Sequence, residues 1–111
     1  MSSEALAIDA DLALPEGTDT RAPGGGVTVA LCGHWEHEGA CRWPHNSRID
    51  AETSPARLRT VVVVAPEERD EVVSKVEARL RADERWSVTG FSTGDINDDE
   101  RELAERLARA T

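Results

Sequence analysis

The sequence predicts one small α/β domain, an open sheet of three or four strands covered by two helices in a two-layer sandwich. Three observations indicate this fold class: valine-rich runs that suit strands, two segments whose valines and leucines recur at helical spacing, and a length of 111 residues, which suits a single domain. The expected order is strand, long loop, strand, helix, strand, helix. An α+β arrangement of the same elements is the alternative.

Residues 1–26 are predicted to form a flexible acidic leader, and residues 27–111 the folded domain. The leader holds five acidic residues and one basic residue, and it ends in a proline and three glycines, 23–26. Apolar residues alternate between Leu6 and Leu14 with the period of a strand, so an extra edge strand is the alternative. Because Ala and Asp are poor strand formers, the leader is preferred. The glycine run does not match a phosphate-binding loop, since it precedes the first predicted strand and no lysine lies nearby.

The first strand of the domain is predicted at 27–34. Its two faces would carry Val27, Val29 and Leu31 on one side, and Thr28, Ala30, Cys32 and His34 on the other. A loop punctuated by Gly and Pro follows at 35–57. The run LRTVVVVA at 58–65 is the clearest strand of the chain, and its consecutive valines indicate burial on both faces, as in a central strand.

Pro66 is expected to open a helix, because Pro is favoured at the first helical position and acidic residues follow it. The buried stripe of this helix would be Val72, Val73, Val76 and Leu80. The segment 86–91 is predicted as the third strand, joined to 58–65 by a right-handed parallel crossover. Asn97 is expected to cap the last helix, with Glu100 completing a capping box.

The net charge of the chain limits the classes of partner that it can bind. The net charge is −9, with 22 acidic and 13 basic residues, and such a surface repels nucleic acid and anionic membranes. The start of the chain has no signal-peptide pattern, and the longest purely apolar run, 61–65, is too short to span a bilayer. A cytoplasmic location is therefore predicted, where the two cysteines stay reduced. An unidentified protein or small molecule is the expected partner, and the sequence does not indicate an oligomeric state.

All histidines and cysteines of the chain gather in one segment of the predicted loop region 32–57. They are Cys32, His34, His37, Cys41 and His45. Thiolate and imidazole are the ligands of tetrahedral zinc sites. The predicted zinc ligands are Cys32, His34, Cys41 and His45, with His37 as a spare. Such an ion would hold the loop against the sheet, because its binding energy becomes folding energy. The sequence therefore predicts a non-enzymatic binding or regulatory module with a structural zinc ion.

Two other interpretations of the same segment stay open. In the first, the loop belongs to a small enzyme, either a metal-dependent hydrolase or a thiol enzyme in which Cys41 pairs with His34 or His37. Glu36 and Glu38 would then be general bases or hydrogen-bond acceptors beside the imidazoles. In the second, the domain binds no metal and acts through protein contacts. Trp35 and Trp43 would then be a ligand or partner surface, although tryptophans in so small a domain more often complete the core.

Overall fold

The computed structural model describes residues 3–32 and 43–109, and of Cys32 only the backbone. It has four strands and three helices in these ranges, with short 3-10 turns at Pro66–Glu68 and Asp98–Glu100. The elements in chain order are β1 (Glu4–Ala13), α1 (Ala22–Cys32), β2 (His45–Asp50), β3 (Ala56–Val64), α2 (Arg69–Ala82), β4 (Ser87–Gly94) and α3 (Arg101–Arg109).

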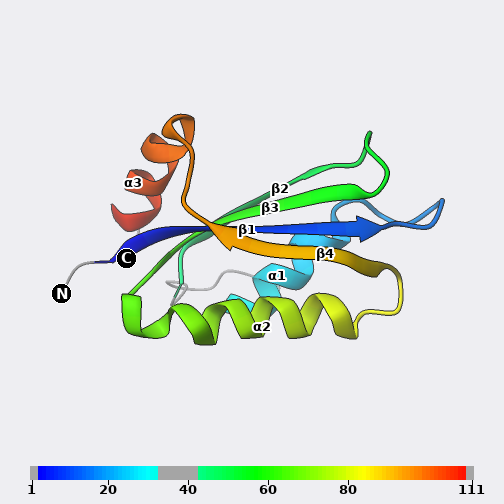
Figure 1. Ribbon diagram of the computed structural model, residues 1–111, viewed down its shortest axis with the longest axis horizontal. Coiled ribbons are helices and arrows are strands. Elements are labelled where there is room, and N and C mark those ends of the chain that lie inside the picture. The colour runs from blue at the N-terminus through cyan, green and yellow to red at the C-terminus, as the bar shows by residue number, and fades with distance from the viewer. Residues whose placement is uncertain (1–2, 33–42, 110–111) are drawn as a thin grey trace.

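The strands form one sheet in the order β2-β3-β1-β4, and every neighbouring pair is antiparallel. Because β3 and β4 both run antiparallel to β1, they run parallel to each other with β1 between them, and α2 connects them (Figure 1). The order β-α-β-β-α-β with a split β-α-β unit is the ferredoxin-like arrangement, here followed by α3. The predicted α/β fold class is confirmed. The predicted order differs from the structure in three elements: it lacked β1, it placed a strand where α1 lies, and it placed β2 within the loop 35–57.

The prediction of a flexible leader at 1–26 is wrong for the residues described. β1 lies inside the sheet, where Ala7 pairs with Val61 of β3 and with Gly94 of β4. It is therefore not an edge strand either. The alternation of its apolar residues was the valid signal, since Leu6 and Ile8 are buried against the helices. Packing on both sides outweighs the weak strand propensity of Ala and Asp.

The prediction of a strand at 27–34 is also wrong, because residues 22–32 form α1. Val27 and Leu31 are spaced i, i+4, which places both on the buried face of a helix, and both belong to the core. A short apolar run fits either period, and packing on the sheet selects the helix. Gly24–Gly26 consequently lie in the first turns of a helix that follows a strand, not ahead of a strand as the sequence suggested.

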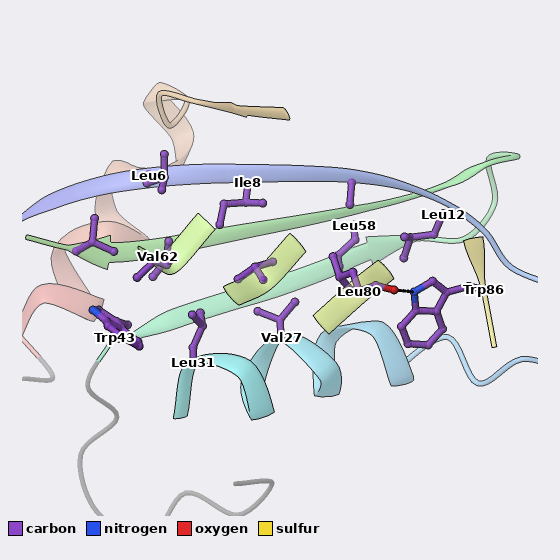
Figure 2. Packing of buried hydrophobic residues seen from close by; sticks show 14 residues of the cluster. Leu6, Ile8, Leu12, Val27, Leu31, Trp43, Leu58, Val62, Leu80 and Trp86 are labelled. Atoms are coloured by element: carbon purple, nitrogen blue, oxygen red, sulfur yellow. Dashed lines mark hydrogen bonds between the residues drawn. The ribbon is translucent and has the colours of Figure 1, made fainter. Parts of the chain in front are cut away.

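α1 and α2 cover one face of the sheet, and the core lies between them and that face (Figure 1). β1 and β3 contribute alternate residues to it, as Figure 2 shows. Trp43 and Trp86 close opposite ends of this core. Both side chains are 4% exposed, and the indole Nε1 of Trp86 donates a hydrogen bond to the carbonyl oxygen of Leu80 at 3.0 Å. The core therefore uses two of the three tryptophans.

The predicted helices after Pro66 and Asn97 are confirmed. Pro66 opens a 3-10 turn that continues into α2, whose Val72, Val76 and Leu80 are buried. Asn97 and Glu100 form the expected capping box, in which the Asn97 backbone N–H donates to Glu100 Oε1 at 2.8 Å. α3 differs from the prediction in its position: it packs against β3 on the face opposite α1 and α2, so the molecule has a third layer at one end (Figure 1).

Candidate functional site

The predicted zinc ligands lie at the connection from α1 to β2. Cys32 is the last residue of α1 and His45 is the first residue of β2. Cys41, His34 and His37 fall between them, outside the described residues, as do Trp35 and Glu36. The two described ligand candidates thus mark the two ends of the Cys/His segment, which joins a helix to an edge strand of the sheet.

The imidazole ring of His45 is held between a carbonyl group and a hydroxyl group. Its Nδ1 lies 3.1 Å from the carbonyl oxygen of Trp43, and its Nε2 lies 3.1 Å from Oγ1 of Thr28 on α1. Since a carbonyl oxygen only accepts hydrogen bonds, Nδ1 carries the proton and donates it to Trp43. In the neutral ring Nε2 is then an acceptor, and the Thr28 hydroxyl is its donor.

The same hydroxyl has a second acceptor within reach. Thr28 Oγ1 lies 3.2 Å from the carbonyl oxygen of Gly24, one turn earlier in α1. A hydroxyl has a single proton, so Thr28 cannot donate to Gly24 and to His45 at once. When the His45 ring is doubly protonated, Nε2 becomes the donor and the Thr28 proton turns to Gly24. The contact therefore suits both charge states of the imidazole.

This geometry brings β2 onto the helix turn that leads into Cys32. Thr28 and Cys32 are four residues apart in α1, which is about 6 Å along the helix axis at 1.5 Å per residue. A metal-bound histidine typically donates its other ring N–H to a carbonyl or carboxylate, which orients the ring. His45 has this orienting bond from Nδ1 to Trp43, and its Nε2 faces α1.

A groove of about 360 Å³ lies between the first turns of α1 and the edge strand β2. Its wall on the β2 side includes Ser47, whose Oγ lies 2.8 Å from Oγ1 of Thr60. The other lining residues are Thr20, Arg21, Gly24, Gly25, Thr28, His45, Asn46, Arg48, Ile49 and Leu58. The groove therefore joins hydroxyl groups and the imidazole of His45 to an apolar patch formed by Ile49 and Leu58.

The backbone of β2 lies at one edge of the sheet. The N–H of Val63 donates to the carbonyl oxygen of Pro44 at 2.9 Å, and Pro44 directly precedes β2. In an antiparallel pair such hydrogen-bonded positions alternate with positions whose N–H and C=O groups point away from the partner strand. The outward positions of β2 are therefore His45, Ser47 and Ile49. Their main-chain N–H and C=O groups point away from β3 at the edge of the sheet.

Trp43 is not a surface residue. It is 4% exposed and packs in the core near Leu31 and Val62 (Figure 2), so the interpretation of Trp43 as a ligand or partner surface is corrected. Its role is structural, because burial of the indole fixes the backbone whose carbonyl orients His45. The sequence prediction also missed Thr28, because the residue was assigned to a strand face. In a helix, Thr28 and Cys32 would lie on the same face because they are four residues apart, so a helix prediction would have drawn attention to Thr28.

Residues 3–32 and 43–109 contain no group of three or more His, Cys, Asp or Glu side chains placed to hold a metal ion. Four of the five metal-ligand candidates have no described side chain, so this result concerns acidic clusters and His45 alone. Within the same ranges, no helix has the length and apolar character that a bilayer span requires. No protein-family model matches the chain, and no curated protein matches it.

Proposed function

We propose that this chain is a small, non-enzymatic binding or regulatory module of the cytoplasm in which the α1–β2 connection holds a structural zinc ion. Cys32, His34, Cys41 and His45 are the proposed ligands, and His37 is the spare. The observation that carries the proposal is the position of the His45 ring, which is oriented by Trp43 and faces α1 one turn before Cys32. Nε2 has one lone pair, so on binding the ion it would give up its contact with Thr28, whose hydroxyl proton would turn to the Gly24 carbonyl. Metal-bound histidines are typically oriented in this way.

The proposed ion would act on the fold rather than on a substrate. α1 and β2 are joined by a segment that holds three of the five ligand candidates, and a tetrahedral centre would fasten this segment at both ends. With four protein ligands no coordination position is left for water, which is the pattern of a structural site. The groove between α1 and β2 would then be the binding surface that the ion stabilises.

The test is elemental analysis of the chain purified without a histidine tag and dialysed. We expect about one zinc ion per chain, as a single tetrahedral site requires. The variants His45→Ala and Cys41→Ser should lose the ion, and a chelator should lower the unfolding temperature of the unmodified chain. Substitution by cobalt should give the absorption spectrum of a tetrahedral site with thiolate ligands.

Thr28→Val is the matched control, because it removes the hydroxyl that contacts His45 but leaves all five ligand candidates in place. It should retain zinc. A chain that binds no zinc, and whose unfolding temperature does not respond to the chelator, would rule out the proposal.

A metal-free interaction module is the second candidate, and the edge of β2 favours it. The outward main-chain groups of Ser47 and Ile49 are the kind of edge to which an extended peptide adds as a further strand. A zinc-free chain that is fully folded would support this candidate. A cysteine that alkylates much faster than free thiol would instead support the enzymatic alternative with Cys41 and His37.

A further inference from the structure

Arginines gather around a second cavity, which lies between the first turns of α1 and the end of α2. The cavity measures about 400 Å³ and is lined by Arg21 before α1, Arg79 in α2 and Arg85 between α2 and β4. The remaining lining residues are Asp19, Ala22, Gly25, Gly26 and Val29. Three separate segments of an acidic chain thus bring cationic side chains to one concave surface.

Asp83 holds two of these arginines in place. Its Oδ2 lies 2.7 Å from Nη2 of Arg85 and 3.5 Å from Nη1 of Arg79, and its Oδ1 accepts from Nε of Arg85 at 3.0 Å. The Asp83 side chain is 8% exposed, and hydrogen bonds from Arg85 lower its pKa to about 2. Asp83 is therefore ionised at neutral pH and forms ion pairs with both guanidinium groups.

Two further contacts limit the motion of these arginines. The guanidinium of Arg85 lies over the ring of Trp86, 5.0 Å from its centroid, and Trp86 is anchored in the core. The stem of Arg79 runs beside α1, where a Cβ added at Gly26 would lie 3.8 Å from its Cγ. Preformed positions lower the entropy that a ligand must overcome to bind.

The charges of the cavity are not balanced. Asp19 faces Arg21 at 3.4 Å, and Asp83 is shared by Arg79 and Arg85, so three cations meet two carboxylates. A guanidinium has five N–H donors, which is more than one carboxylate can occupy. The site therefore combines excess positive charge with surplus donors, and arginine forks match the oxygens of phosphate groups.

We propose that this cavity binds a small phosphate dianion, either inorganic phosphate or the phosphate group of a small monoester. Arg79 and Arg85 are the proposed main contacts, and Arg21 closes the site from the loop before α1. A small ligand is favoured over a polyanion, because the net charge of −9 repels extended phosphate chains whereas a single group meets mainly its local surroundings. Ala22, Gly25 and Gly26 leave room for the organic part of a monoester.

The experiment is a titration of the full chain with inorganic phosphate and, separately, with glycerol phosphate, at neutral pH and constant ionic strength. Binding is followed by the NMR signals of the Trp86 indole and the Arg85 Nε–H. We expect saturable shifts, and tighter binding of glycerol phosphate if the organic part is recognised. Arg79→Gln and Arg21→Gln should each weaken binding by about tenfold or more.

Arg101→Gln is the control, since Arg101 is an exposed arginine on α3 paired with Asp98 and lies outside the cavity lining. It should bind as the unmodified chain does. Arg21 is 89% exposed, so its variant should fold normally, which preserves the test if Arg79→Gln does not fold. Absence of saturable shifts, or equal affinities of Arg21→Gln and Arg101→Gln, would overturn the proposal.

Discussion

Arg59 of β3 and Glu100 at the start of α3 form a two-point ion pair across the face of the sheet that α1 and α2 leave uncovered. Arg59 Nη2 lies 2.6 Å from Glu100 Oε1, and its Nε lies 2.8 Å from Oε2. Arg59 Nη1 also donates to Asp9 of β1 at 2.8 Å. The Glu100 side chain is 4% exposed, so this pair connects α3 to the two central strands from a nearly buried position.

Replacing Glu100 with Gln should lower the free energy of unfolding by about 3 kcal/mol, because the change leaves the Arg59 charge without its buried partner. Urea denaturation at pH 7 measures the loss. Glu102→Gln is the matched control, since Glu102 is exposed on the same helix, and it should change the free energy by no more than about 0.5 kcal/mol. Equal effects of the two variants would show that the pair does not hold α3.

Acid should destabilise the protein through two carboxyl groups. Hydrogen bonds from Arg59 lower the pKa of Glu100 from 4.5 to about 2, and those from Arg85 lower the pKa of Asp83 from 3.8 to about 2. A pKa that is lower in the folded state contributes stability above the unfolded-state pKa, and this contribution disappears as the pH falls towards the folded-state pKa. The free energy of unfolding should therefore decrease between about pH 5 and pH 2.

Urea denaturation at several pH values between 7 and 2 measures this decrease. The Glu100→Gln variant lacks one of the two groups, so its free energy of unfolding should depend less steeply on pH over the same window. Parallel profiles of the variant and the unmodified chain would contradict the role of Glu100.

Two glycine-to-alanine changes should have opposite effects on stability. Gly17 has a φ of +88° in the turn closed by the bond from Thr18 N–H to the Pro15 carbonyl, so Gly17→Ala should cost about 1 kcal/mol of unfolding free energy. Gly26 lies inside α1, and an added Cβ would meet Arg79 Cγ at an ordinary 3.8 Å, so Gly26→Ala should add about 1 kcal/mol. Thermal unfolding of both variants measures these changes in stability. A lower stability of Gly26→Ala would argue against the helix α1.

The backbone amides of β1 should exchange with solvent as slowly as those of the core. β1 pairs with β3 along one side and with β4 along the other, so opening it requires breaking the centre of the sheet. Hydrogen exchange of Ile8 and Ala10 measured by NMR should approach the free energy of global unfolding. The loop at 51–54 is the internal reference for rapid exchange. If β1 exchanged as fast as this loop, residues 4–13 would be a flexible leader after all.

The proposed site was only partly accessible from the sequence. The clustering of cysteine and histidine between Cys32 and His45 is visible in the sequence, because it requires only residue types and spacing. The contact of His45 with Thr28 is not visible in the sequence. It joins β2 to α1, whereas the sequence pattern predicted that Thr28 lies in a strand. The arginine cavity was equally hidden, since Arg21, Arg79 and Arg85 lie far apart in the chain.

The sequence by itself determined the elements whose signals are local. The valine run of β3, the proline that opens α2 and the Asn97–Glu100 capping box act within a few residues, so their structures follow from neighbouring side chains. Only the tertiary structure decided the places of β1, α1 and α3. β1 is a strand because two partner strands satisfy its backbone, α1 is a helix because Val27 and Leu31 must reach one core, and α3 crosses to the other face because Arg59 offers Glu100 a partner there.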